Sequence, residues 1–180
     1  MQVNNNYSPN FGMALRIHPR AKGKLQQRTM EYLQGLAQIG EECKTHKYVD
    51  LDLTESLMPV VNRRDCANAY TAPFKPIKVS GDAVEVEARW AGTAATGVQP
   101  GENYSVYLEF ANADEARKAY ESMVKANEKC DALESAFNFA KLQEQSILYK
   151  VKVQQEAAAR QAKINAEVDK LMSAFPNVDA

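Results

Sequence analysis

The sequence contains little cysteine and histidine, and this shortage excludes several kinds of site. Three cysteines, Cys43, Cys66 and Cys130, and two histidines, His18 and His46, are spread over 180 residues, and no CxxC pair is present. A structural zinc site needs about four nitrogen or sulfur ligands in local pairs. An odd number of widely spaced cysteines is typical of free, reduced thiols. The sequence therefore predicts neither a metal site nor a disulfide framework, and no activity that depends on a cysteine.

Long apolar runs and a strong net charge are also missing. No apolar run approaches the ~18 residues of a membrane span, and Met1–Pro9 has neither the basic nor the apolar region of a secretory signal. The formal net charge is −1. Residues 1–111 carry twelve basic and twelve acidic groups, and residues 112–180 carry ten and eleven, so the balance does not favour nucleic acid as a partner. We expect a cytoplasmic protein without a membrane segment.

The motifs of the commoner enzyme classes are absent. The sequence has no GxxxxGK[ST], GxGxxG, HExxH or GxSxG, and neither histidine has the carboxylate-rich surroundings of a Ser/His/Asp site. Asp50 and Asp52 share one face of a predicted strand, as paired acids or ligands of a hard cation would. A solvated strand face is the interpretation that we favour. We predict no catalytic residue and no cofactor, and an enzyme is the third of three functional hypotheses.

Glycine and proline are both missing between Gly101 and Pro176. The stretch from Asp114 to Ala174 is dense in Ala, Glu, Lys and Gln, which are strong helix formers. We expect this stretch to be predominantly helical. Asp131 and Glu134 resemble a capping box, so a kinked helix or a helical hairpin with a break near Asp131 is an alternative to one unbroken rod.

The apolar pattern changes along this helical stretch. Up to Ala140 the apolar face, which includes Cys130, is broad enough to pack on a sheet. Further on it narrows to a set that we call the apolar stripe. Four of its members follow the 4-3-4 spacing of a coiled-coil seam, and a methionine widens it. The apolar stripe consists of Ile164, Val168, Leu171, Met172 and Phe175. We predict that it binds a protein partner or a second copy of the chain.

The residues before this stretch predict an α+β arrangement. Alternating or apolar runs predict short strands, glycine at position 81 predicts a three-residue hairpin turn, and helical spacing predicts one helix from Ala21 to Thr45. The predicted strands cover residues 11–17, 47–53, 58–61, 77–79, 83–90 and 103–110. We expect a small, mainly antiparallel sheet covered by the N-terminal helix and the start of the long C-terminal helix. The expected division is a flexible segment at 1–10, an α+β part at 11–140 and a helical tail at 141–180.

The segment SVYLEFANADEARKAY, within Tyr104–Tyr120, resembles the third strand and second helix of the RNA-recognition motif. The resemblance implies that Tyr104 and Tyr107 could stack on bases. It covers under a tenth of the chain. The strand FGMALRI lacks the paired exposed rings of that family, and Gly101 begins a segment without the usual basic residue. We favour an ordinary strand-to-helix junction.

Five cations near the start of the first predicted helix form a basic cluster without an acidic residue among them. The basic cluster consists of Arg16, Arg20, Lys22, Lys24 and Arg28. Cations at a helix N-terminus oppose the helix dipole, which can mark a site for an anion or an acidic partner. The alternative is neutralisation by acidic residues of the sheet or tail. Our first functional hypothesis is a non-catalytic interaction or assembly protein that associates through its long C-terminal helix, and an anion- or nucleic-acid-binding module is the second.

Overall fold

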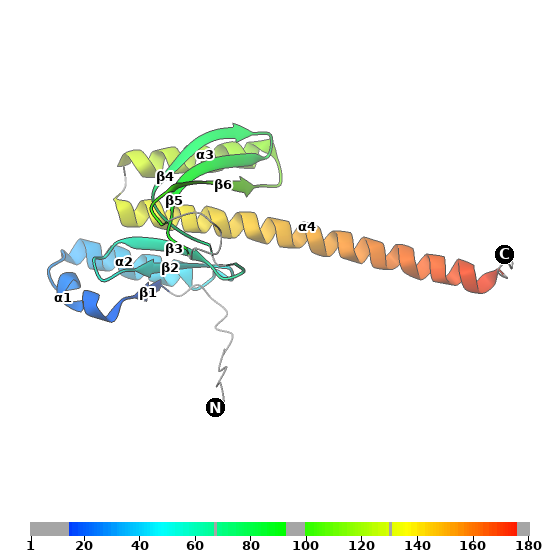
Figure 1. Ribbon diagram of the computed structural model, residues 1–180, viewed down its shortest axis with the longest axis horizontal. Helices are drawn as coiled ribbons and strands as arrows, with labels where there is room; N and C mark the ends of the chain where they lie inside the picture. Colours follow the sequence, from blue (N-terminus) through cyan, green and yellow to red (C-terminus); the bar gives the residue numbers. More distant parts are fainter. Residues whose placement is uncertain (1–14, 67, 93–99, 130, 176–180) are drawn as a thin grey trace, which may run out of the picture.

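The computed structural model describes residues 15–66, 68–92, 100–129 and 131–175 of the chain. These residues form an α+β structure from which one long helix projects (Figure 1). Its elements, in chain order, are β1 Leu15–Ile17, η1 Pro19–Ala21, α1 Lys22–Leu25, α2 Met30–Cys43, β2 Val49–Leu53, β3 Pro59–Arg63, β4 Ala69–Ser80, β5 Ala83–Trp90, β6 Asn103–Glu109, α3 Ala113–Lys129 and α4 Ala132–Ala174. The predicted fold class is confirmed in its coarse form.

The strands lie in the sheet in the order in which they follow one another along the chain, from β1 to β6. β1 runs parallel to β2, and each following pair is antiparallel. The parallel pair requires a crossover, which η1, α1 and α2 supply. The sheet is therefore mixed: four of its five strand pairs are antiparallel, in line with the expected mainly antiparallel sheet, and the parallel pair lies at one edge.

The first predicted helix is two helices instead of one. Lys22–Leu25 ends after one turn, and Met30–Cys43 begins anew after Thr29. Thr29 has extended backbone angles, and its side-chain oxygen accepts a hydrogen bond of 3.3 Å from the Tyr32 N–H. A threonine in this position caps a helix N-terminus, so the break follows from a capping signal that the apolar spacing concealed.

The β4–β5 hairpin is longer and tighter than the sequence suggests. β4 begins at Ala69, and its pairing with β5 shifts register in two places that span Pro73 and Pro76. Proline has no N–H for the ladder, which is why a strand was not predicted there. Ser80 pairs with Ala83, so the turn has two residues, and the positive φ of +63° at Gly81 requires glycine.

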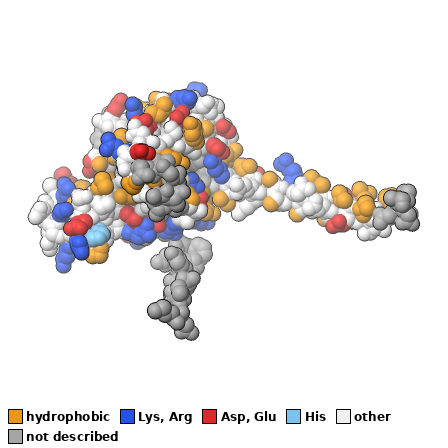
Figure 2. Space-filling model, viewed as in Figure 1, with side chains coloured by type: hydrophobic (Ala, Val, Ile, Leu, Met, Phe, Trp, Pro, Cys, Tyr) orange, Lys and Arg blue, Asp and Glu red, His pale blue; other side chains and the backbone are white. Residues whose placement is uncertain are grey.

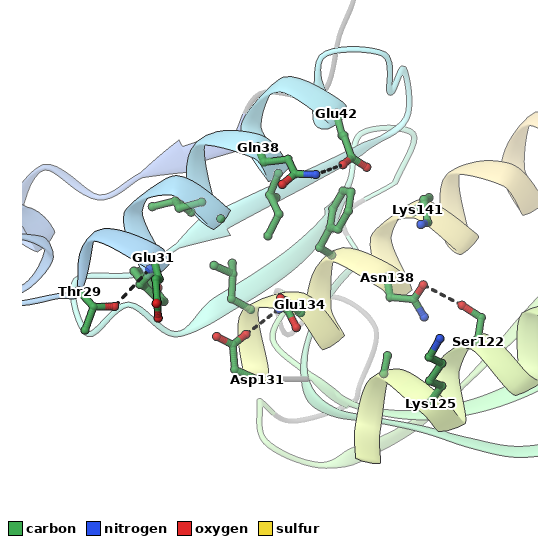
Figure 3. Close-up of a pocket in the computed structure, with 17 residues that line it drawn as sticks. Thr29, Glu31, Gln38, Glu42, Ser122, Lys125, Asp131, Glu134, Asn138 and Lys141 are labelled. Atoms are coloured by element: carbon green, nitrogen blue, oxygen red, sulfur yellow. Dashed lines mark hydrogen bonds between the residues drawn. The ribbon is translucent and has the colours of Figure 1, made fainter. Parts of the chain in front are cut away.

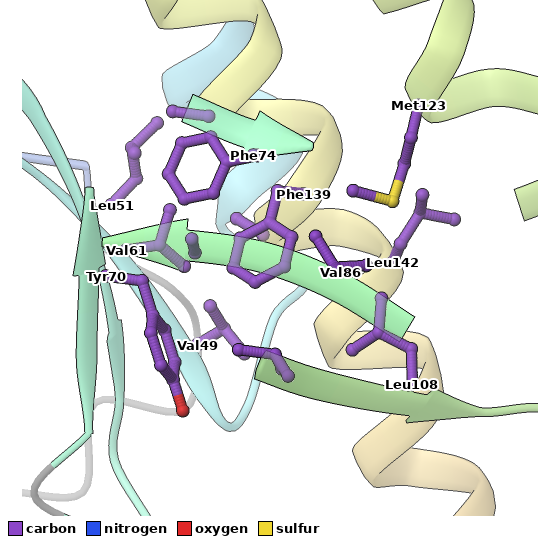
Figure 4. Close-up of a cluster of buried hydrophobic side chains, with 14 of the residues drawn as sticks. Val49, Leu51, Val61, Tyr70, Phe74, Val86, Leu108, Met123, Phe139 and Leu142 are labelled. Carbon is purple, nitrogen blue, oxygen red and sulfur yellow. The ribbon is translucent and has the colours of Figure 1, made fainter. Parts of the chain in front are cut away.

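The main hydrophobic core lies between the sheet and the helices α3 and α4. α3 packs against β4 and β5, and α4 packs against β2, β3, β4 and β6. Phe139 of α4 stacks on Phe74 of β4 with ring centres 4.5 Å apart, and its edge contacts Tyr70 at 5.9 Å (Figure 4). Leu36 and Ile39 of α2 belong to the same buried cluster.

The predicted helical stretch is confirmed, but it is divided into two helices. α3 ends at Lys129 and α4 begins at Ala132, after Asp131, whose carboxylate accepts a hydrogen bond of 2.9 Å from the Glu134 N–H. Cys130, which we expected on the broad apolar face, lies outside the described residues. The two helices form a hairpin, yet α4 then runs on away from the sheet (Figure 1). The break does not fold the apolar stripe back onto the rest of the protein.

Candidate docking surface on the projecting part of α4

The first half of α4 is fixed to the sheet by polar contacts as well as by apolar packing. The buried carboxylate of Glu144 accepts hydrogen bonds from the backbone N–H groups of Lys47 (2.7 Å) and Tyr48 (2.9 Å). At the opposite edge of the sheet, the Glu109 N–H donates to Ser146 Oγ at 2.8 Å. Lys150 Nζ then lies 3.1 Å from a carboxylate oxygen of the same Glu109. These contacts hold α4 across the sheet and set the direction in which it leaves.

Contact between α4 and the rest of the protein stops within one turn of Lys150. Ile147 is the last buried residue of the helix, Val151 is half-buried, and every residue from Lys152 to Phe175 is exposed. We call Lys152–Phe175 the rod, and the described residues 15–151 the body. At 1.5 Å per residue, the rod is about 35 Å long. Figure 2 shows hydrophobic side chains along its surface.

The apolar stripe lies entirely on the rod. Its five side chains expose between 48% and 66% of their surface, and Phe175 exposes the most. No tertiary contact supports the rod among the described residues, although packing is the main source of helix stability in most proteins. A solvated helix has no need of Ile, Val, Leu, Met and Phe on one side, and an exposed apolar surface of this kind marks an interaction site.

The body carries a groove of about 660 Å³ that is lined by residues of α2, α3 and α4 (Figure 3). Tyr32, Leu36 and Phe137 supply apolar lining. Asn138 is buried; its Oδ1 lies 3.1 Å from Ser122 Oγ, while its Nδ2 has no partner among the described residues. The groove could bind an apolar ligand or helix, but its own residues do not indicate which.

His46 lies close to this groove, at the junction of α2 and β2. It is 6% exposed, and its Nδ1 has no hydrogen-bond partner among the described residues. Burial lowers the pKa of His46, and Lys141 lowers it further, while Glu144 and Glu42 oppose the shift. No described hydroxyl or thiol hydrogen-bonds to the ring, so a nucleophile–base pair of the serine-hydrolase kind is not formed.

The structure separates the members of the basic cluster. Arg16 bonds Asp52 (2.8 Å between Nη2 and Oδ2) and lies 3.4 Å from Asp50, and Arg20 lies 3.8 Å from Glu55. Arg28 sits over the ring of Tyr32, with 5.2 Å between the guanidinium carbon and the ring centre. Lys22 and Lys24 are exposed on α1. Neutralisation by carboxylates of β2 and of the turn after it thus accounts for the two arginines, and the anion-site hypothesis stays a prediction.

Asp50 and Asp52, which we expected on a solvated strand face, belong to the same ionic network, and Asp50 is buried. Arg64 bonds Asp50 at 2.6 Å, and Asn62 donates to Asp52 at 2.7 Å. Two arginines therefore face two carboxylates, which leaves the cluster without excess negative charge for a cation. Among the described residues, no group of three or more His, Cys, Asp and Glu side chains is placed to hold a metal ion.

The remaining candidate side chains do not form a site together. Tyr104 is half-buried against Trp90, with 5.2 Å between ring centres, whereas Tyr107 is exposed on the other face of β6. The two rings therefore do not form one stacking platform. Cys43 is buried, and burial raises the pKa of its thiol to about 12. None of the described helices is long and apolar enough to cross a membrane.

Comparisons of the chain with protein-family models, with curated protein sequences and with solved structures give no match. The function must therefore be inferred from the geometry of the chain itself. Within that geometry, the rod is the surface whose side chains are least explained by the fold.

Proposed function

We propose that the chain is a non-catalytic interaction or assembly protein that self-associates through the apolar stripe of its C-terminal helix. The observation that carries this proposal is the placement of all five stripe residues on a rod that leaves the body. Each of them lies beyond the last buried residue of α4, so none contributes to the core of its own chain.

The spacing of the stripe supports a helical partner. Ile164, Val168, Leu171 and Phe175 are separated by four, three and four residues, which is the spacing at which apolar side chains of two helices interlock. A second copy of the same stripe offers a matching surface without any further assumption about the partner. This is why we propose self-association before an unrelated partner.

The proposed contact is weak enough to be reversible. Fully burying a large apolar side chain contributes about 1.5–3 kcal/mol, and the stripe residues are already about half covered by their own helix. Ten such side chains in a pair of copies give a gross gain on the order of 10 kcal/mol. Association costs about 4–15 kcal/mol. We therefore expect a concentration-dependent equilibrium.

A double substitution tests this proposal. Replacing Val168 and Leu171 by glutamate places four like charges in the proposed contact of two copies. We expect the wild-type mass, measured by light scattering at micromolar to high micromolar concentrations, to rise above that of one chain. The Val168→Glu/Leu171→Glu variant should remain a monomer, because a charge cannot be buried without a partner.

A matched control carries the same added charge on the other side of the rod. Ala159 and Ala166 are exposed and lie about opposite the stripe at 100° per residue. The Ala159→Glu/Ala166→Glu variant should therefore associate like the wild type. A wild-type protein that is monomeric over the whole range would contradict the proposal, and so would equal loss of association in both variants.

We further propose that the protein acts in the cytoplasm. Cys43 and Cys66 are both free thiols in the structure, which agrees with a reducing compartment. A test is the compartment in which the tagged protein is found by microscopy of living cells, and an oxidising compartment would contradict this placement.

A further inference from the structure

The direction of the apolar stripe relative to the body restricts how two copies can meet. Residues 18 apart on an α-helix are five turns apart and point the same way. Ile164 therefore has the direction of Ser146, and Val168 has that of Lys150. Both of these earlier residues contact Glu109, the last residue of the edge strand β6.

The far end of the stripe gives the same result. Met172, inside the helix, lies 36 residues, or ten turns, after Ala136, and Ala136 is fully buried in the core. At 100° per residue, the mean direction of the stripe is within about 50° of the mean direction of the sheet-contacting residues of α4. The body and the stripe thus lie on the same side of the helix.

We infer that two copies pair through the apolar stripe in antiparallel orientation, with Ile164 opposite Phe175 and Val168 opposite Leu171 of the second copy. This inference rests on the proposed self-association and adds its geometry. The spacing of four, three and four residues is the same in both chain directions. Each of the four seam residues in one copy therefore lies opposite a seam residue of an antiparallel copy. Every large apolar side chain of the seam then faces another one.

A parallel pair meets a steric obstacle at the body. In such a pair the two stripes would face each other, with the helix axes 8–10 Å apart. Each body lies on the same side of its helix as the stripe, so both bodies would lie between the two helices. Only thirteen residues, about 20 Å, separate Ile164 from Val151. At the usual crossing angle of about 20°, the helix axes diverge by only about 7 Å over that length. The partner helix would then occupy the space in which β6 packs on α4.

An antiparallel pair avoids this obstacle. The end of one stripe, Phe175, comes opposite Ile164 of the other copy and stops about 20 Å short of the other body. The two bodies lie at opposite ends of the paired rods. The whole stripe is buried in both copies, and neither helix clashes with the sheet of the other copy.

A single spin label on the outer face of the rod measures the orientation. Gln155 is exposed and points about 150° away from the stripe. The label is attached to a Gln155→Cys chain in which Cys66 and Cys130 are replaced by serine. Cys43 is retained, because its buried thiol, with a pKa of about 12, does not react at neutral pH. Distances between labels are measured by pulsed electron spin resonance at a concentration where light scattering shows association.

The antiparallel pair places the two labels 29 residues, about 44 Å, apart along the axis and about 20 Å apart across the pair, which gives a distance of about 50 Å. A parallel pair places them about 20 Å apart. A main distance near 50 Å supports the inference, and any other distance in an associated sample overturns it while leaving self-association intact. A sample that stays monomeric, with no distance between labels, overturns the proposed function and this inference together. Adding Val168→Glu and Leu171→Glu to the labelled chain should abolish the distance of about 50 Å.

Discussion

Gln143 is the residue whose side chain fits its surroundings least well. It lies on the sheet-facing side of α4 and is 1% exposed, and neither atom of its amide has a hydrogen-bond partner among the described residues. Leaving a buried amide without partners costs about 1–3 kcal/mol. Gln143→Met keeps the length of the side chain and removes the polar atoms, so we expect it to raise the free energy of unfolding by about that amount, measured in urea. The control Gln145→Met, on the exposed side of the same helix, should change it little, and a loss of stability in Gln143→Met would contradict this account.

His46 makes stability depend on pH. Because burial lowers its pKa, the folded protein binds fewer protons than the unfolded chain as the pH falls below the ordinary histidine value of about 6.5. His46 should therefore reduce stability on acidification and have no effect above that pH. We expect the loss of unfolding free energy between pH 7.5 and pH 5.5 to be smaller in His46→Gln than in the wild type. An equal or larger loss in the variant would contradict the lowered pKa of His46 in the folded protein.

Individual residue roles were the least predictable from the sequence. The alternation in β2 placed Asp50 and Asp52 on the face opposite Val49 and Leu51, but the expectation that this face is solvated is wrong for Asp50, which is buried. It could not reveal the arginine partners of the two carboxylates, which come from β1 and from the segment after β3. Glu144 was missed because a glutamate in a helix normally indicates a solvated position. Only the fold brings it to the two backbone N–H groups at the start of β2.

At the scale of elements, the turn between α3 and α4 depends on one cap. Asp131 is the N-cap of α4, and its carboxylate accepts from the Glu134 N–H. Removing such a cap costs about 0.5–2 kcal/mol. We expect Asp131→Ala to lower the free energy of unfolding by this amount, followed by circular dichroism in urea. The control Asp169→Ala removes an exposed aspartate from the rod and should have little effect; equal effects in the two variants would assign the loss to charge rather than to capping.

The elements with a strong local signal were predicted well. The alternating strands that became β2, β5 and β6 and the breaker-free helical stretch were all found from the sequence, because period and residue type determine them locally. β4 was missed before Ile77, since its prolines read as irregular structure. The parallel pairing of β1 with β2 could not be predicted, because strand partners depend on contacts far apart in the chain.

At the scale of the whole molecule, the relation between rod and body is the main finding. The sequence shows that the apolar face narrows after Val153, which indicated that the helix extends beyond the core against which it packs. The sequence could not show where the contact with the sheet stops, or that the sheet and the apolar stripe share one side of α4. The burial of α4 in the structure shows where the contact stops, and the periodicity of the helix gives the side on which the stripe lies. Together they support the proposal that two copies pair side by side along their rods.

The most direct test of this account is hydrogen–deuterium exchange at low and high protein concentration. A free rod has no tertiary contact that opposes local opening of its helix, so the amides of the rod should exchange fast in the dilute protein. In the concentrated protein, those around the apolar stripe should become protected, while the amides of β5 and the first half of α4 exchange equally slowly in both samples. Exchange in the rod that does not depend on concentration would contradict association through the apolar stripe.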